Sequence, residues 1–299
     1  MGYKIKTLGT SFRDFSAANI GPLNLTAGVP IAELFFGIHA RCILAAGAGE
    51  NIAHILIQMD EITVTRAGQT IVSIENGQDL FALIKAPWND QAPDVCDGVS
   101  SSHYVYLKGL TLPCSYPSGA AGEFQLTVEN ALDASTGSEV LSIAEGQGLY
   151  AANYFGQSLC TNKLFHIVKR LYTPAGTSNN EGINIGTEGT LIGLLLWQTT
   201  EQGKTVAKTS ISLYKDIELV IGGESVIDAD CLTGQGTQGT TYGCESNTNV
   251  SFPSSILDEY VYIDFRRQPW DCRGKSVVFK YNGGTADAIR VYPIYMIDW

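Results

Sequence analysis

The sequence predicts an all-β chain built from two similar β-sandwiches in tandem. Two observations carry this prediction: a hairpin pattern that occurs twice, and a composition with few charges and many glycines. Charged residues make up 16% of the 299 residues, and glycine occurs 32 times. This composition argues against coiled coils and helix bundles and favours strands joined by turns.

The repeated pattern is that of a hairpin with one buried face. Residues 60–74 read DEITVTRAGQTIVSI, and residues 216–229 read DIELVIGGESVIDA. In each copy, apolar and polar residues alternate on both sides of a glycine, Gly68 or Gly223, and these glycines are 155 residues apart (223 − 68). A hairpin that recurs at about half the chain length indicates a duplicated domain.

Other segments match in the same order along both halves. The offset between partners drifts from 160 (24 to 184) to 153 (124 to 277), and the drift falls in segments rich in Gly, Ser and Thr. Loops of this composition tolerate changes in length. The matching pairs are 23–25 with 183–185, 61–72 with 216–227, 104–106 with 260–262, and 124–128 with 277–281.

Alternation and β-branched content predict the remaining strands. The segment 163–172 is compatible with a short helix or a strand, and a strand is preferred. The second half is expected to repeat the first. In the first half, strands are expected at 23–25, 31–44, 52–65, 70–74, 80–84, 103–107, 110–112 and 123–128, with a closing strand at 138–144.

These elements divide the chain into an arm, two domains and a linker. Long polar loops at 87–102 and 232–255 occupy the same place in each half, between the hairpin and the tyrosine-containing strand. About eight short strands per half fit two tandem eight-stranded jelly-roll β-sandwiches side by side, a double jelly roll. The expected limits are 1–20 for an N-terminal arm, 21–150 for the first jelly roll, 151–162 for a linker and 163–299 for the second jelly roll.

Composition also argues against several classes of protein. No apolar run reaches the length of about 18 residues that suggests a membrane-spanning helix. The N-terminus lacks the apolar core of a signal peptide. The formal net charge of −11, with no cluster of Lys and Arg, argues against direct, sequence-specific binding of nucleic acid.

Motifs that would indicate catalysis or a cofactor are missing, so neither is expected. There is no nucleophile elbow, phosphate-binding loop or dinucleotide-binding motif. Asp228 and Asp230 could help to bind calcium, but solvated acids are the preferred interpretation. Four histidines lie on separate expected strands without the clustering that a cupin-type metal site requires: His39, His54, His103 and His166.

Seven cysteines cannot all pair within one chain. Most are expected to be buried thiols or surface residues. Their positions beside the tyrosine-containing strands also allow loop disulfides, such as Cys96–Cys114 or Cys231–Cys244, and Cys272 follows the second of these strands.

Two surface features are weaker. The aromatic pairs Tyr104/Tyr106 and Tyr260/Tyr262 could stack on sugars, but packing in a core or between subunits is preferred because both halves carry them. Asn249 begins an Asn-Val-Ser sequence in an expected loop and is a candidate for glycosylation.

The duplicated pattern from about residue 23 to 299 resembles the double jelly-roll major capsid proteins of tailless icosahedral DNA viruses. The compact members, often from viruses with an internal membrane, are similar in size. The resemblance rests on the repeated strand pattern with a long loop before the seventh strand of each half. It carries over no catalytic residue.

This resemblance implies a homotrimer whose six jelly rolls form a pseudo-hexagonal capsomer of an icosahedral shell. The implied partners are neighbouring capsomers, minor capsid and vertex proteins, and an internal viral membrane reached by the N-terminal arm. The implied location is the virion, after assembly in the host cell cytoplasm.

A different class of function is a tandem β-sandwich spike, adhesin or lectin that binds glycans through its loops. A double-cupin enzyme is a third class, and the lack of a histidine cluster argues against it. Oligomeric mass separates the first two, because a capsid protein should form stable trimers or larger particles.

Overall fold

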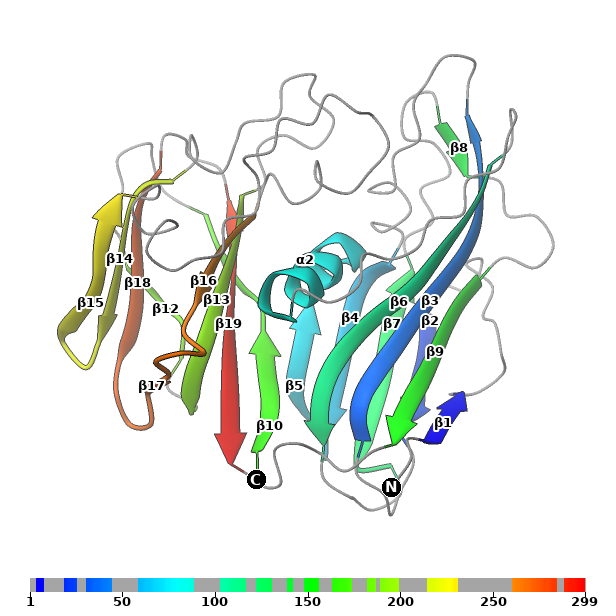
Figure 1. Cartoon of the computed structure of the whole chain (residues 1–299), viewed down its shortest axis with the longest axis horizontal. Helices are drawn as coiled ribbons and strands as arrows, with labels where there is room; N and C mark the ends of the chain where they lie inside the picture. The colour runs from blue at the N-terminus through cyan, green and yellow to red at the C-terminus, as the bar shows by residue number, and fades with distance from the viewer. Residues whose placement is uncertain are drawn as a thin grey trace. The chain divides into compact units, whose positions relative to one another are not determined.

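The computed structural model of the chain divides into two compact units, with the boundary between Phe165 and His166 (Figure 1). No helix among the residues it describes is long and apolar enough to cross a membrane. Those residues are 4–7, 19–25, 31–44, 59–88, 103–116, 122–130, 139–141, 148–155, 163–173, 182–186, 189–198, 214–230, 260–283 and 288–298.

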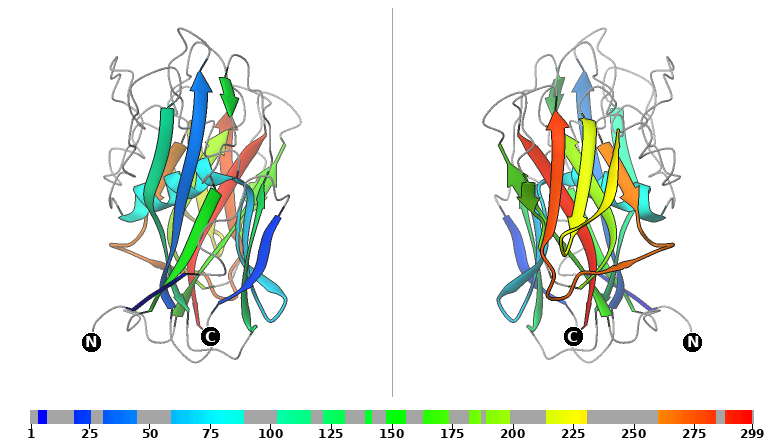
Figure 2. Two further views of the ribbon diagram at one scale, coloured as in Figure 1. Left: turned by 90° about the vertical axis from the view of Figure 1, so that its right-hand side faces the viewer. Right: turned by 90° about the vertical axis from the view of Figure 1, so that its left-hand side faces the viewer.

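The first unit contains two antiparallel sheets. One has the order β1-β9-β3-β6, with β8 on the far end of β3, and the other has the order β2-β7-β4-β5. In Figure 2, left, β3 and β9 run side by side, as their register requires. The elements are β1 (Lys4–Thr7), β2 (Asn19–Asn24), β3 (Ile31–Leu44), β4 (Met59–Arg66), β5 (Gln69–Ile74), α2 (Gly77–Trp88), β6 (His103–Tyr116), β7 (Phe124–Asn130), β8 (Glu139–Leu141) and β9 (Gly148–Phe155).

The second unit repeats these sheet orders. Its strands pair as β11-β19-β13-β16, with β17 on β13, and as β12-β18-β14-β15. Matched in chain order, each unit therefore has the same eight principal strands in the same two sheets. The elements are β10 (Lys163–Val168), which contains the boundary, β11 (Arg170–Tyr172), β12 (Gly182–Asn184), β13 (Thr190–Gln198), β14 (Tyr214–Ile221), β15 (Glu224–Asp230), β16 (Tyr260–Asp264), β17 (Trp270–Asp271), β18 (Val277–Gly283) and β19 (Ile289–Asp298).

The two hairpins share their register and an irregularity. In β4–β5, the pairs Val64–Val72 and Thr65–Thr70 leave Ile71 as the extra residue of a β-bulge. In β14–β15, the pairs Leu219–Ile227 and Val220–Ser225 leave Val226 in the same role, 155 residues later. The prediction of one hairpin built twice is confirmed down to the position of the bulge.

A second bulge is also repeated. The register of β3 on β9 shifts between Ile31 and Glu33, and that of β13 on β19 shifts between Leu191 and Gly193. Main-chain hydrogen bonds recur at the offsets found in the sequence: the Leu25 N–H donates to the Phe124 carbonyl, and the Ile185 N–H donates to the Val277 carbonyl, each at 3.0 Å. The two units are therefore the same backbone design.

Each unit buries apolar side chains from both of its sheets. In the first unit, Tyr116 and Phe124 stack with their ring centroids 4.9 Å apart. In the second unit, one continuous core draws on both sheets, so that unit is a sandwich. Its members include Ile183, Leu191, Leu194, Leu196, Ile217, Leu219, Ile263, Val277, Phe279, Val291 and Tyr295.

The expected strand at 80–84 is wrong, because these residues lie in α2. Asn76 caps this helix: its Oδ1 accepts from the Asp79 N–H at 3.0 Å, and its carbonyl accepts from the Leu80 N–H at 3.0 Å. The run Leu80–Ile84 is buried at every position, so it shows no helical periodicity in the sequence. The helix contacts β4, β5 and β6, and Ile71–Ile74 of β5 are buried.

The closing strand of the first unit is β9 rather than the expected 138–144. β9 pairs with β3 as β19 pairs with β13, whereas β8 pairs only with residues 42–44. Residues 148–155, expected largely in the linker, thus complete a sheet. The long loop also precedes the sixth principal strand of its unit, β6, and not the seventh.

The expected N-terminal arm contains strand residues. Lys4–Thr7 form β1 and pair with Ala152–Phe155 of β9, as β11 pairs with β19. Residues 8–18 and the expected loop at 232–255 lie outside the described residues. The domain limits 21–150 and 163–299 remain predictions.

Candidate functional site

The described residues contain no group of three or more His, Cys, Asp or Glu that could hold a metal ion. His166 is buried in β10. Asp228 is exposed on β15 and faces Glu218 of β14 directly across the ladder. Among the residues that the structure describes, a network of hydrogen-bonded charged side chains lies elsewhere, in the connection between β16 and β18.

This connection, Asp264–Ser276, contains two turns of the same type. The Arg266 N–H and Nε both donate to Asp264 Oδ1 at 2.9 Å, and its Nη2 donates to Oδ2 at 2.6 Å. Arg273 repeats this arrangement on Asp271, with its N–H at 3.2 Å, Nε at 2.9 Å and Nη2 at 3.0 Å. Each turn has the sequence Asp-X-Arg, and its arginine donates hydrogen bonds to the carboxylate of the aspartate two residues earlier.

The middle residue of each turn points into the unit. Phe265 is 4% exposed and Cys272 is 0% exposed, and both belong to the core cluster. The Phe265 N–H donates to the Ile192 carbonyl and the Cys272 N–H donates to the Gly189 carbonyl, both at 2.9 Å. Because Phe265 and Cys272 are buried, the arginines that follow them, Arg266 and Arg273, lie on the exposed side of the connection.

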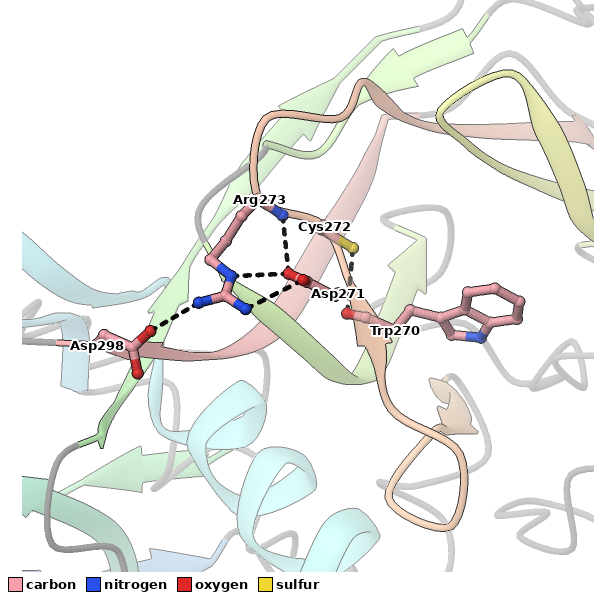
Figure 3. Close-up of polar contacts among 5 residues, drawn as sticks. All are labelled: Trp270, Asp271, Cys272, Arg273 and Asp298. Carbon is pink, nitrogen blue, oxygen red and sulfur yellow. Dashed lines mark hydrogen bonds and ion pairs between the residues drawn. The ribbon is translucent and has the colours of Figure 1, made fainter.

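Arg273 also reaches the end of the last strand. Its Nη1 donates to Asp298 Oδ2 at 3.0 Å, so one guanidinium bridges two carboxylates (Figure 3). The Cys272 Sγ lies 3.5 Å from the Trp270 carbonyl that accepts its hydrogen bond. The ion pair between Arg273 and Asp298 thus joins the connection to β19, and the hydrogen bond from the Phe265 N–H to the Ile192 carbonyl joins it to β13.

These contacts change the acidity of the groups involved. Hydrogen bonds from the Arg273 side chain and backbone lower the pKa of Asp271 to about 2. Partial burial opposes ionisation of Asp264, but hydrogen bonds from Arg266 outweigh it and the pKa of that carboxyl is lowered. Burial raises the pKa of the Cys272 thiol. At neutral pH both acids are therefore fully charged and the thiol is protonated.

The cysteines that were candidates for disulfides have different outcomes in the structure. Cys272 is a buried free thiol, so the disulfide that its position allowed is not formed in this structure. Cys114 lies within β6 rather than in a loop. Cys96, Cys231, Cys244 and the glycosylation candidate Asn249 lie outside the described residues, so their pairing and modification remain predictions.

The second tyrosine pair packs inside the unit. Tyr260 and Tyr262 are each 1% exposed, and the Tyr260 ring lies 6.4 Å from that of Trp197. The guanidinium carbon of Arg290 lies 3.3 Å from the Trp197 ring centroid. The preferred interpretation of packing is confirmed for this pair, which offers no face for a sugar to stack on.

The paired Asp-X-Arg turns were not recognised from the sequence. The signal was present, because Asp-Phe-Arg and Asp-Cys-Arg lie seven residues apart and four of the 19 Lys and Arg residues fall within 266–275. What the sequence could not show is that Phe265 and Cys272 are both core residues, which is the feature that orients the charges.

Comparison of sequences identifies no relative: no family profile and no curated protein matches the chain. Comparison of structures finds solved chains with a similar fold. The STIV MCP matches with a TM-score of 0.70 at 11% identity, over 99% of this chain and 97% of that chain. The chain is a double jelly roll.

The same double jelly roll is found in other solved structures. The major capsid protein P2 from bacteriophage PM2 matches with a TM-score of 0.60 at 9% identity, over 100% of this chain and 98% of that chain. A chain from the Sulfolobus turreted icosahedral virus structure matches with a TM-score of 0.69 at 12% identity, covering 99% of this chain and 90% of that chain. At these identities the shared property is the fold.

Proposed function

We propose that this chain is the major capsid protein of an icosahedral virus and that it assembles as homotrimeric, pseudo-hexagonal capsomers. The supporting observation is the duplication: two units with the same eight-strand order, matching capsid proteins along at least 97% of both chains in two cases. The match is not to one domain of a larger protein, so it supports a role for the whole architecture.

The physical logic follows from symmetry. Three copies of a chain with two similar sandwiches present six similar bodies around a three-fold axis, and such a tile can pack in a hexagonal array. Sheet edges such as β15 and β2 would be covered by neighbours, which removes the hazard of exposed strand edges.

The proposed partners are other copies in the trimer, neighbouring capsomers, and minor capsid and vertex proteins. The residues before β2 that lie outside β1 are proposed to contact an internal viral membrane. The proposed location is the virion, with assembly in the host cell cytoplasm. The role is structural, without catalysis, and the net charge of −11 argues against direct sequence-specific contact with nucleic acid.

The oligomeric mass of the purified chain tests this proposal. Size-exclusion chromatography with light scattering should give a stable species of three times 32.2 kDa, or large particles. Electron microscopy of that species should show a hexagonal outline. A monomer at all concentrations would overturn the proposal. The glycan-binding alternative is not supported, since Tyr260 and Tyr262 are buried.

A further inference from the structure

The strand β15 lies at the edge of its sheet. Among the described residues it ends the order β12-β18-β14-β15 and pairs on one side only, with β14. No position within 224–228 is buried, whereas Ile71–Ile74 of its counterpart β5 are all buried. A strand edge carries N–H and C=O groups that can accept a further strand from another chain. β15 is therefore a docking edge in need of an occupant.

The charge of β15 is entirely negative. Its sequence, ESVIDAD, contains three acids and no base. Glu224 and Asp228 are exposed, and neither has an ion-pair partner among the described residues. At the 155-residue offset they correspond to Gln69 and Ser73, so the hairpin fold does not require these two charges. Both carboxylates are available to a partner of positive charge.

The strand β1 is an edge of the first unit, and its charge is positive. It begins the order β1-β9-β3-β6, and in the part of the chain that the structure describes its one ladder is with β9. Its sequence, KIKT, contains two lysines and no acid. The two units of one chain thus end in edge strands of opposite charge, which are complementary in hydrogen-bonding capacity and in electrostatics.

Each of these strands begins at the corresponding end of its own unit. β1 starts beside the arrowhead of β9, where Lys4 pairs with Phe155, and β5 starts at this same end of the first unit (Figure 1). Glu224 begins β15 directly after the hairpin turn, as Gln69 begins β5. In a ring of units that stand in the same direction, β1 and the start of β15 would therefore lie level and run parallel.

We propose that β1 of one copy adds to the free edge of β15 of the next copy in the trimer. This inference rests on the proposed function. In a three-fold ring of six units, first and second units alternate, so each second unit lies between the first unit of its own chain and that of a neighbouring copy. A contact between two different surfaces of one chain closes such a ring after three copies. The lysines of β1 are then placed to neutralise Glu224 and Asp228.

Cross-linking with a carbodiimide tests this contact in the unmodified protein, because the reagent joins an amine to a carboxylate only where the two touch. The trimer is formed from a mixture of isotopically labelled and unlabelled chains. Mass spectrometry should find peptides that join Lys4 or Lys6 to Glu224 or Asp228, and pairs of one labelled and one unlabelled peptide should be among them. Such mixed pairs identify a contact between copies.

Charge reversal measures the strength of the contact. Lys4→Glu with Lys6→Glu, and separately Glu224→Lys with Asp228→Lys, should each raise the dissociation constant of the trimer about tenfold at low salt. Mass photometry at low concentration gives this constant. The variant that carries all four changes should recover most of the wild-type affinity. Added salt should reduce the differences, because Glu224 and Asp228 are exposed.

Asp60→Lys is the matched control for Asp228→Lys. Both changes replace an exposed acid on a hairpin strand, but β4 has a neighbour on each side, β5 and β7, so Asp60 does not lie on a free edge. Asp60→Lys should keep the wild-type affinity and Asp228→Lys should weaken the trimer. Circular dichroism should show both variants folded.

Two results would overturn this inference and leave the proposed function standing. One is a wild-type trimer without mixed-isotope cross-links between β1 and β15, and the other is a trimer whose affinity is indifferent to both charge reversals. A wild-type chain that stays monomeric at all concentrations would overturn both the inference and the proposed function.

Discussion

Ala67 and Gly222 occupy the same position in the two hairpins, and both have a left-handed backbone, with φ of 47° and 61°. The next residues, Gly68 and Gly223, have φ of 84° and 89°. Two successive positive φ values define the tight turn that matches strand twist. Each first residue also donates its N–H to the start of the neighbouring strand segment, to Glu123 or Ser276, at 2.8 Å.

This pair gives opposite predictions for substitution. Ala67→Asn should stabilise the first unit by about 0.5 kcal/mol, because Asn accepts the left-handed conformation better than Ala. Gly222→Ala should destabilise the second unit by about 1 kcal/mol, because a residue with a Cβ is strained at a φ of 61°. Urea unfolding of both variants checks this, and shifts of the same sign would contradict it.

Gly193 is fixed by a close approach of Tyr262. A Cβ at position 193 would lie 2.6 Å from the Tyr262 hydroxyl oxygen and 2.8 Å from its Cε2. Gly193→Ala should therefore destabilise the protein by about 1–3 kcal/mol. In the background of Tyr262→Val the same change should cost much less, because the clashing ring is absent. Equal costs in both backgrounds, measured by denaturant unfolding, would show that the ring is not the cause.

The pKa of Asp271 should depend on Arg273. Arg273→Gln should raise this pKa from about 2 towards 3.8, because the largest contribution to the lowering is the Arg273 hydrogen bond. The folded pKa lies below the unfolded value, so the contribution of this pair to stability is present above about pH 3.8 and is lost as the pH falls through 2.

Carbon-13 NMR of labelled aspartate carboxyls, assigned with Asp271→Asn, measures this shift. Arg267→Gln is the matched control, because the charged groups that lower the pKa of Asp271 are Arg273 and Lys275, and it should leave the titration unchanged. A pKa of Asp271 that stays near 2 without Arg273 would show that another group holds it down.

Cys272 should resist alkylation in the folded protein. Its side chain is 0% exposed, so the reagent cannot reach the sulfur. Burial also raises the pKa of the thiol, so little of the reactive thiolate is present. Iodoacetamide at pH 8 should label the tryptic peptide Gln268–Arg273 in urea but not under native conditions. Native labelling at the unfolded rate, or recovery of this peptide in a disulfide, would contradict the structure. The same digest without reductant tests the Cys96–Cys114 and Cys231–Cys244 pairings.

The hairpins were predictable because their information is local. Alternation sets the buried face, and a glycine at 68 or 223 sets the turn, so each hairpin can be read within 15 residues. The repeat also gave information on the tertiary arrangement, because segments that recur at a nearly constant offset are expected to have the same neighbours in each half. Because the two halves share one sequence pattern, they are expected to adopt the same strand order in their sheets.

Helix α2 was missed because it is buried at successive positions and so lacks the alternation of apolar and polar residues that marks an amphipathic helix. Leu80–Ile84 are apolar at five successive positions, which a buried strand also shows. The deciding signal was the cap, Asn76 with Asp79 three residues later. β9 was missed for a different reason: GLYAANYF is short of β-branched residues, and its pairing with β3 is a tertiary property.

The connection Asp264–Ser276 was only partly predictable. Its basic residues are visible in the sequence, but the orientation of Arg266 and Arg273 depends on where Phe265 and Cys272 are buried. Burial in turn depends on hydrogen bonds to Gly189 and Ile192, more than 70 residues earlier in the chain. No pattern within the connection itself carries that information.

The shared bulge has a consequence for engineering chimaeras. Because Ile71 and Val226 take the same extra position, a graft of one hairpin onto the other unit would keep the ladder in register. The exchange is nonetheless one-directional. Moving β15 into the first unit would place Asp228 where Ser73 is 8% exposed beside α2, whereas moving β5 the other way only exposes apolar side chains to water. The two hairpins share one backbone, and their side chains decide that it can be exchanged in one direction and not in the other.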